Sequence, residues 1–325
     1  MTPLERALRE RIAAQGPISV EAYMEACNTY YYATRDPLGV EGDFTTAPEI
    51  SQMFGEIIGA SLADVWKRAG GPADAIYAEL GPGRGTLASD ALRMLRAAGF
   101  SGECHFVEAG PVLREVQRTA VANGVWHESI DDLPAKPLLL VANEFLDALP
   151  VRQHVAGMER RVMVAAGGLA FDRDGETVET SPARDEAVAS IATCVAAKGG
   201  AALFVDYGYE RSGPGDTFQA MHAHNYAPVL ASPGEQDLTA HVDFEALANA
   251  ARDAGAMVTS LVGQGEWLVR LGIESRAQSL SRANPDRASD IQAALERLTS
   301  HDQMGTLFKV IAIHSPDWPA PAGFA

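Results

Sequence analysis

The stretch from Ile76 to Leu87, IYAELGPGRGTL, constrains the fold of this chain more than any other. It opens with a short apolar run typical of a buried strand, and Gly81, Gly83 and Gly85 follow at alternate positions. Leucine and alanine at helical spacing then continue to Gly99, which indicates an amphipathic helix. Glycine lets the backbone approach a ligand, and a helix start offers free N–H groups. This order of strand, glycine turn and helix therefore predicts a nucleotide-type site.

The spacing of the glycines indicates which ligand the turn binds. A dinucleotide site reads G-x-G-x-x-G, whereas here the third glycine comes one residue early and Thr86 takes its place. The form G-x-G-x-G after an acid, here Glu79, is typical of sites for S-adenosylmethionine (SAM), in which the acid can hold the cationic amino end of the methionine. SAM is therefore the favoured ligand. Two alternatives stay open: a site for another nucleotide, and a tight structural turn that binds no ligand.

Composition and charge limit the classes of protein to which this chain can belong. The chain has 325 residues, 47% of them hydrophobic, which is enough for one large domain or two small ones. No run approaches the ~20 apolar residues of a membrane span. The net charge of −17 argues against nucleic acid as a partner. Three widely separated cysteines without a C-x-x-C motif indicate reduced thiols and a cytoplasmic location.

The region before the glycine turn is predicted to be helical. Two short helices, at 2–15 and 19–27, precede the segment GDFTTAPEISQMFGEIIGASLADVW. In this segment Thr46 and Glu49 match a capping box, and apolar residues then mark one face of a long helix. Because this helix leads directly into the glycine-turn strand, Asp43, Phe44 and Thr45 at its start are expected near the ligand pocket. Without this connection to the strand, the loop before the helix would be predicted only as a helix cap.

Polar side chains follow the later strands, at the edge of a parallel sheet where ligands bind. Glu108 ends the strand CHFVEA, the position at which doubly wound sheets place an acid for ribose hydroxyls. Ser129 and Asp131 follow strand three and are expected near the adenine. Asn143, Glu144 and Asp147 follow strand four, with Asn143 expected at the cofactor, and Asp206 lies at the end of strand five. His222 and His224 have metal-like H-x-H spacing but no evident third ligand, so no metal is predicted.

We expect two regions in this chain. Residues 1–70 form a helical region that completes the cofactor pocket, and residues 71–325 form the SAM-binding domain. Two insertions are expected in that domain: antiparallel strands near 151–180, and a longer one near 210–300 that begins with an irregular stretch. The last predicted strand is TLFKVIAIH, at 306–314.

Six stretches together resemble the MidA family of SAM-dependent methyltransferases. They are GDFTTAPEISQMFGEIIG, ELGPGRGTL, ANEFLDALPV, VDYGY, GDTFQAMHAHNYAPVLASPGEQDLTAHVDF and QMGTLFKVIA, and they run from residue 42 to 312. The resemblance implies an α/β class I methyltransferase fold, a doubly wound and mostly parallel seven-stranded sheet with its last strand antiparallel. It also implies methylation of a protein arginine, with a complex I subunit as the target in mitochondria.

Arginine chemistry makes carboxylates the candidate catalytic groups. A guanidinium has a pKa of roughly 13 or more, so its nitrogen attacks poorly unless nearby carboxylates localise the positive charge away from it. Glu144 and Asp147 are the first candidates and Asp206 the next, although each acid could be structural. Better-known arginine methyltransferases carry a hairpin with two glutamates after strand four, where this chain has only Glu144 and Asp147.

Two other functions stay open at this stage. A chaperone-like assembly factor would bind SAM and a protein partner without transferring a methyl group. An NAD-type oxidoreductase is disfavoured by the glycine spacing. The sequence does not decide between a monomer and a homodimer.

Overall fold

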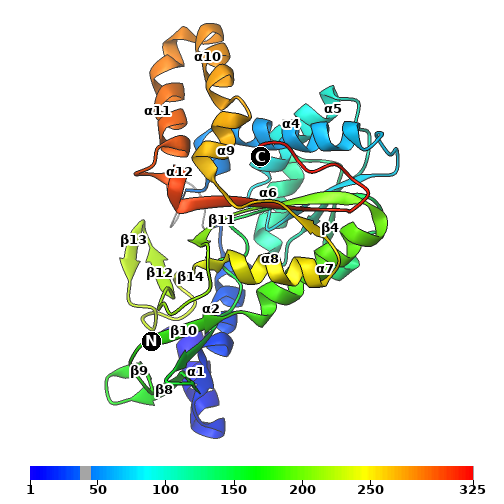
Figure 1. Ribbon diagram of the computed structural model, residues 1–325. Helices are drawn as coiled ribbons and strands as arrows, with labels where there is room; N and C mark the ends of the chain where they lie inside the picture. Colours follow the sequence, from blue (N-terminus) through cyan, green and yellow to red (C-terminus); the bar gives the residue numbers. More distant parts are fainter. Residues whose placement is uncertain (37–44, 325) are drawn as a thin grey trace.

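Continuous apolar runs form the centre of the molecule, a mostly parallel sheet (Figure 1). The computed structural model describes residues 1–36 and 45–324. Within them the main sheet has nine strands, seven of which follow the order β16-β18-β11-β5-β2-β3-β4, with β15 beside β11 and β17 beside β18. The strands are β2 (Ile76–Leu80), β3 (Cys104–Val107), β4 (Gly124–His127), β5 (Leu138–Asn143), β11 (Gly200–Tyr209), β15 (Val242–Asp243), β16 (Met257–Val258), β17 (Val262–Gly263) and β18 (Phe308–His314).

The strand directions confirm the predicted class I methyltransferase sheet. β4, β3, β2, β5 and β11 are mutually parallel, and β18 runs antiparallel to β11. Residues 257–263 add two short strands, β16 and β17, and both pair antiparallel with β18. The break between them leaves the side chain of Thr259 bonded to the backbone of Ala312.

Helices cover both faces of this sheet, because successive strand residues point to opposite sides. Tyr77, Leu139 and Leu203 pack with α4, α5 and the helices after β17, whereas Ala78, Leu140 and Phe204 pack with α7 and α8. Figure 1 shows these two layers above and below the sheet. The helices are α3 (Ala47–Ile50), α4 (Gln52–Arg68), α5 (Thr86–Ala97), α6 (Pro111–Ala120), α7 (Pro182–Lys198), α8 (Phe244–Asp253), α9 (Gln264–Arg270), α10 (Ile273–Ala283), α11 (Ala288–Thr299) and α12 (Met304–Leu307), with 3-10 turns η1 (Ile130–Asp132) and η2 (Pro285–Arg287).

The long helix predicted from Thr46 is in fact two helices, α3 and α4. Ser51 between them is extended, and its side chain accepts the N–H of Met53 to cap α4. The predicted capping box is wrong, because the Thr46 side chain makes no capping bond. Glu49 instead accepts a hydrogen bond from the hydroxyl of Thr86 at 2.5 Å, which ties α3 to the start of α5.

The N-terminal helices pack on the inserted strands and form a third apolar core. Tyr23, Met24 and Cys27 of α2 lie against Val162 and Leu238. The elements of this region are α1 (Pro3–Gln15), β1 (Ile18–Ser19), α2 (Val20–Thr34), β6 (Arg152–Val155), β7 (Met158–Glu159), β8 (Arg161–Ala165), β9 (Gly168–Phe171), β10 (Thr177–Thr180), β12 (Gln219–His222), β13 (Asn225–Ala227) and β14 (Asp237–Thr239). The antiparallel strands predicted near 151–180 are present, and the stretch predicted to be irregular after residue 210 contains a three-stranded sheet. The division at residue 70 stays a prediction.

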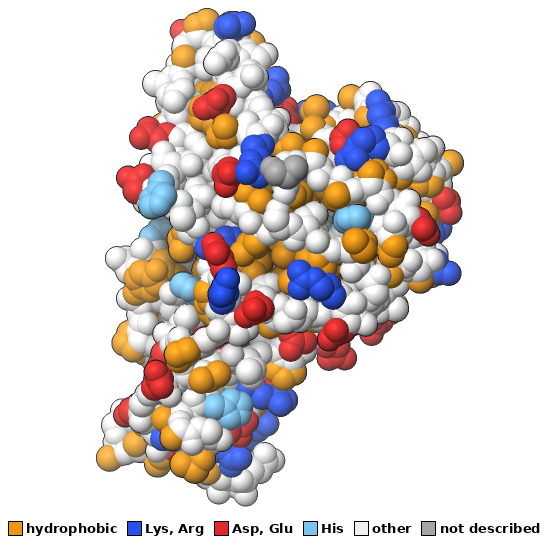
Figure 2. All heavy atoms as spheres, in the orientation of Figure 1, with side chains coloured by type: hydrophobic (Ala, Val, Ile, Leu, Met, Phe, Trp, Pro, Cys, Tyr) orange, Lys and Arg blue, Asp and Glu red, His pale blue; other side chains and the backbone are white. Residues whose placement is uncertain are grey.

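The face of the molecule in Figure 2 does not carry one block of charge. Lysine and arginine side chains lie scattered among acidic ones over the face in Figure 2. No helix among the described residues is both long enough and apolar enough to cross a bilayer.

One buried carboxylate joins the helical hairpin of α10 and α11 to α4. Glu56 of α4 is only 3% exposed and accepts two hydrogen bonds from Arg276 of α10, at 2.6 and 2.8 Å. Arg93 of α5 donates a third at 2.8 Å. Three helices therefore meet at this one acid.

Replacing this acid should destabilise the fold. Glu56→Ala leaves Arg276 and Arg93 without their shared acceptor, so we expect the free energy of unfolding to fall by about 2–4 kcal/mol. The matched control is Asp64→Ala in the same helix, which removes an exposed pair with Arg68 and should cost less than ~1 kcal/mol. Urea denaturation of both variants measures the difference, and equal losses would contradict the anchoring role of Glu56.

Candidate functional site

The glycine turn between β2 and α5 has the backbone that its sequence predicts. Gly81, Gly83 and Gly85 have φ angles of +56°, +53° and +80°, in the left-handed region that favours glycine. A β-carbon at Gly81 would also lie 3.0 Å from the ring of Phe145. Gly85 is the N-cap of α5 and has no side chain to bond the first N–H groups of the helix. These N–H groups are therefore available to a ligand at the turn.

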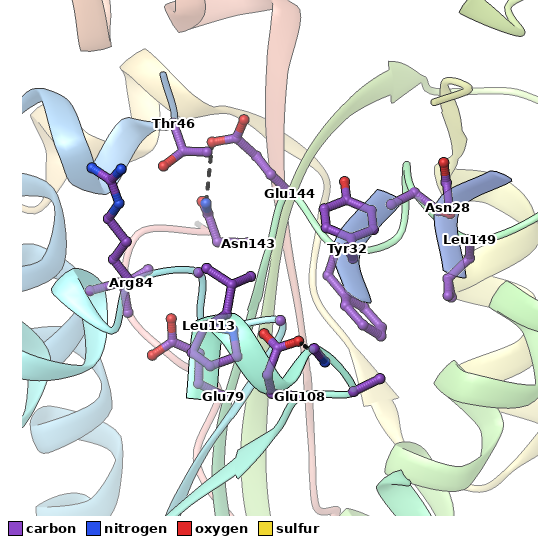
Figure 3. A pocket seen from close by; sticks show the side chains of 18 of the residues that line it. Asn28, Tyr32, Thr46, Glu79, Arg84, Glu108, Leu113, Asn143, Glu144 and Leu149 are labelled. Atoms are coloured by element: carbon purple, nitrogen blue, oxygen red, sulfur yellow. Dashed lines mark hydrogen bonds between the residues drawn. The ribbon is translucent and has the colours of Figure 1, made fainter. Parts of the chain in front are cut away.

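A cavity of about 530 Å³ lies at this edge of the sheet, a size typical of small-molecule sites. In Figure 3 Asn143 and Glu144 lie between Arg84 on one side and Tyr32, Asn28 and Leu149 on the other. The lining residues come from α2, α3, the turns after β2, β3 and β5, and the start of α7: Glu25, Asn28, Thr29, Tyr32, Ala33, Thr46, Pro48, Glu49, Glu79, Gly81, Pro82, Gly83, Arg84, Thr86, Leu87, Glu108, Ala109, Gly110, Leu113, Asn143, Glu144, Phe145, Ala148, Leu149, Pro150 and Ala183.

The structure brings six of the predicted site residues to this cavity. Its lining includes Glu79, Gly81, Gly83, Glu108, Asn143 and Glu144. Thr45 directly precedes the lining residue Thr46, whereas Asp43 and Phe44 lie outside the described residues. The role of each of these residues stays a prediction.

Ser129 and Asp131, predicted at the adenine, are not among the lining residues. The Ser129 hydroxyl caps the short turn η1 by accepting the N–H of Asp131. The Asp131 carboxylate accepts a hydrogen bond from Ser190 of α7 at 2.7 Å. Both side chains therefore have structural partners outside the cavity.

Glu108 enters the cavity from the end of β3. Its Oε1 accepts the N–H of Gly110 at 2.7 Å and its Oε2 accepts an N–H of Gln117 at 3.1 Å. Burial raises its pKa, and these hydrogen bonds oppose the rise. Each carboxylate oxygen can accept a second hydrogen bond, so the pair could still hold two hydroxyl groups.

Glu79 lies at the end of β2, directly before the glycine turn. Its carboxyl accepts a hydrogen bond from the hydroxyl of Tyr77 at 2.7 Å. Burial raises the pKa of Glu79 to about 8, and the Tyr77 hydroxyl opposes this rise. A cationic ligand group beside it would lower the pKa again.

Glu144, the first residue after β5, has a left-handed backbone with φ +49°. Its Oε1 accepts the N–H of Ala47 at 3.1 Å and an amide N–H of Asn143 at 3.2 Å. Burial raises the pKa of Glu144 to about 8, and the nearby carboxylate of Asp147 adds to the rise. This acid therefore faces the cavity in a setting that favours a positive partner.

Asp147 and Asp206, the other predicted catalytic acids, lie behind the cavity and are not among its lining residues. Asp206 accepts the backbone N–H groups of Leu146 and Asp147, at 3.0 and 3.2 Å. Burial and the neighbouring Asp147 raise the pKa of Asp206, and Arg184 opposes the rise. Asp206 thus holds the turn after β5, and the catalytic role predicted for each of the two acids stays a prediction.

Sequence reasoning missed the wall that α2 contributes. Asn28 donates to the carbonyls of Ala148 and Leu238, at 2.9 and 2.8 Å, and the Tyr32 hydroxyl donates to Asp237 at 2.6 Å. The available signal is the run of three tyrosines, Tyr30, Tyr31 and Tyr32, because such a run fits either packing or a substrate entrance. Gln117 was missed as well: it joins Glu108 to the carbonyl of Gly83.

These residues fit SAM. The glycine turn leaves room for backbone approach, Glu108 keeps acceptor capacity for ribose hydroxyls, and Glu79 would hold the amino end. A metal is not needed for methyl transfer from a sulfonium. Among residues 1–36 and 45–324 no three histidine, cysteine or acidic side chains are grouped so that they could hold one.

The sheet order and the glycine turn beside an acid-lined cavity define a class I methyltransferase. Comparison with known proteins gives the family. Residues 57–167 and 155–262 match the model of the family described as "Putative S-adenosyl-L-methionine-dependent methyltransferase". The chain belongs to this family, which is the MidA family that the sequence resembles.

Curated relatives cover nearly the whole chain. The Drosophila melanogaster "Protein arginine methyltransferase NDUFAF7 homolog, mitochondrial" is 35% identical over 95% of this chain and 84% of its own length. The Danio rerio "Protein arginine methyltransferase NDUFAF7, mitochondrial" is 33% identical over 94% of this chain and 85% of its own.

A solved structure supports both the fold and the cofactor. The crystal structure of a Burkholderia thailandensis protein bound to S-adenosyl-homocysteine is 28% identical, with a TM-score of 0.87, and the match covers 99% of this chain and 94% of that one. The chain is therefore a SAM-dependent methyltransferase by family, and the predicted cofactor is confirmed.

Removing the acid of β3 should weaken SAM binding. If Glu108 holds the ribose as predicted, Glu108→Ala removes two charge-assisted hydrogen bonds, each worth about 1.5–3 kcal/mol, so we expect at least a tenfold loss of affinity by calorimetry. A 2′-deoxy analogue controls for a local change of fold: it should bind wild type and variant more nearly alike. A variant that still discriminates fully between the two nucleosides would show that Glu108 is not the ribose ligand.

The pH dependence of SAM affinity should report Glu79. Its pKa of about 8 in the free protein would fall beside the cationic amino group, so binding below pH 8 releases a proton. Affinity should therefore rise from pH 6 to pH 8, by up to about tenfold per pH unit. Calorimetry in two buffers of different ionisation enthalpy counts the released protons.

Two variants separate the carboxyl groups of the cavity. Glu79→Gln should remove most of this pH dependence, whereas Glu144→Gln should keep most of it. A SAM affinity that does not change with pH in the wild-type protein would contradict the placement of the amino end at Glu79.

Proposed function

We propose that this protein transfers a methyl group from SAM to a side-chain nitrogen of arginine in a protein. The observation that carries the proposal is the cavity-facing carboxyl of Glu144, at the end of the strand next to the one that leads to the glycine turn. The acceptor is a protein, with a complex I subunit as the first candidate from the family resemblance. The names of the Drosophila and zebrafish relatives, both protein arginine methyltransferases, support the residue type.

The charge of the cavity favours a cationic acceptor. Its lining includes five acids, Glu25, Glu49, Glu79, Glu108 and Glu144. The arginine of the lining, Arg84, pairs with Asp36 at 2.8 Å and approaches Glu49 at 3.9 Å. The excess of acid fits a guanidinium better than an anionic or an apolar substrate.

Methyl transfer to arginine requires positioning and local charge control. When bound, SAM supplies an electrophilic methyl group on a sulfonium, and the new N–C bond forms as the C–S bond breaks. Glu144 would accept an N–H of the guanidinium and localise its positive charge away from the attacking nitrogen. The attacking nitrogen then loses one proton, which restores a guanidinium. Asp147 and Asp206, predicted as catalytic, would act by holding the turn of Glu144 in place.

Removing the charge of Glu144 tests this role. Glu144→Gln keeps the size of the side chain, and we expect transfer of labelled methyl from SAM to an arginine-bearing protein to fall by roughly 100-fold or more. SAM affinity should stay within a few-fold. The matched control, Glu266→Gln, changes an exposed acid on α9 that pairs with Arg270 and should leave transfer unchanged.

The pH profile adds a second readout. At saturating SAM, kcat/KM for the acceptor should rise with pH with a midpoint no higher than about 8, because only ionised Glu144 localises the guanidinium charge. Glu144→Gln should flatten this limb. Equal losses of SAM affinity and transfer would place Glu144 in the cofactor site. SAM binding without label on any protein would favour an assembly factor that binds SAM without transfer.

A further inference from the structure

An amide oxygen at the edge of the sheet has no partner. Asn143, the last residue of β5, lines the cavity and is 8% exposed. Its Nδ2 donates to Glu144, the bond drawn in Figure 3, but its Oδ1 is buried and accepts no hydrogen bond within the described part of the chain. A buried acceptor without a donor costs free energy, so an atom left this way inside a cavity indicates a ligand that brings an N–H or O–H group.

A second free acceptor lies on the next residue. Glu144 Oε1 takes both N–H groups that reach this carboxyl, from Ala47 and from Asn143. No residue among 1–36 and 45–324 donates a hydrogen bond to its Oε2. The end of β5 therefore offers two acceptor atoms on adjacent side chains, one neutral and one acidic.

The orientation of the Asn143 amide follows from its hydrogen bond to Glu144. Glu144 Oε1 already accepts the N–H of Ala47, and the nitrogen of the Asn143 amide supplies its second donor. The oxygen of the same amide then faces away from that bond. Asn143 can thus accept a hydrogen bond from a ligand through Oδ1, while one of its two amide N–H groups is engaged by Glu144.

Two acceptors on neighbouring side chains match a planar fork of donors. A guanidinium carries five N–H groups in one plane and can donate to two acceptors at once, whereas an ammonium is a compact point charge. We propose that Asn143 Oδ1 accepts an N–H of the substrate guanidinium alongside Glu144 and so selects arginine over lysine. This inference rests on the proposed function and moves Asn143, predicted at the cofactor, to the substrate.

The test measures binding without requiring catalysis. The full-length protein, saturated with S-adenosyl-homocysteine, is titrated with ethylguanidinium and with butylammonium, and binding is followed by NMR. Wild-type protein should bind ethylguanidinium at least tenfold more tightly than butylammonium. Asn143→Ala should weaken ethylguanidinium binding by tenfold or more, with butylammonium binding changed less than threefold.

A second variant distinguishes an acceptor from a residue that only positions Glu144. Asn143→Asp keeps an oxygen at the same place, so it should bind ethylguanidinium within about threefold of wild type. If this variant loses as much affinity as Asn143→Ala, Asn143 acts through its N–H on Glu144 and the proposal is overturned. Unchanged binding in both variants overturns it too.

Two controls separate this inference from the proposed function. Affinity for S-adenosyl-homocysteine should stay within threefold in both variants, and a parallel loss would return Asn143 to the cofactor and overturn the proposal. Transfer of labelled methyl to arginine-bearing and lysine-bearing peptides is measured on the same proteins. Selective guanidinium binding without any transfer would support the role of Asn143 while contradicting the arginine methyltransferase function.

Discussion

The carboxylate of Asp206 in β11 accepts two backbone N–H groups, those of Leu146 and Asp147, across the end of the sheet. On the other side of the same turn Arg184 donates to four carbonyl groups, those of Leu146, Asp147, Ala240 and His241. An acid and a guanidinium thus satisfy the donors and the acceptors of one turn. Because a non-glycine residue at φ +49° costs on the order of 1 kcal/mol, Glu144 keeps this backbone only while the turn is held from both sides.

The same burial that makes this turn rigid makes its acids sensitive to charge. Glu79 and Glu144 both have a pKa of about 8, raised first by burial, so near neutral pH both are largely protonated without a ligand. A positive group beside either one restores the carboxylate and offsets the cost of burying it. The cavity is therefore complementary to two cations at two separate places, and these correspond to the amino end of the cofactor and to the acceptor arginine that we propose.

The sequence predicted the half of the site that is local along the chain. The left-handed turn at Gly81, Gly83 and Gly85 and the acids that end β2 and β3 follow from short-range pattern, because a strand end and its first turn lie together in any doubly wound sheet. The direction in which a polar side chain points was harder to predict. Asp206 was expected at the end of its strand, but it lies three residues before the end of β11 and its side chain bonds the neighbouring turn. Period-two alternation does not say which polar groups the backbone of that turn requires.

The contribution of α2 could not be read from the sequence for a different reason. Asn28 and Tyr32 reach the cavity because Tyr23, Met24 and Cys27 pack on strands more than a hundred residues later in the chain. A helical pattern indicates an apolar face but not the element that it packs against. The break at Ser51 is a related case, since the pairing of Glu49 with Thr86, far along the chain, takes the place of a local cap.

The two halves of the cavity differ in how far apart in the sequence their residues lie. The half beside the glycine turn is built within one unit, from β2 through α6, with Gln117 joining Glu108 to the carbonyl of Gly83. The other half is assembled from α2, the turn after β5 and β14, where Asn28 bonds the carbonyls of both Ala148 and Leu238. This second half therefore depends on packing between segments that are distant in the sequence. In the proposed function, the wall that would face the acceptor is therefore built by α2 as much as by the turn after β5.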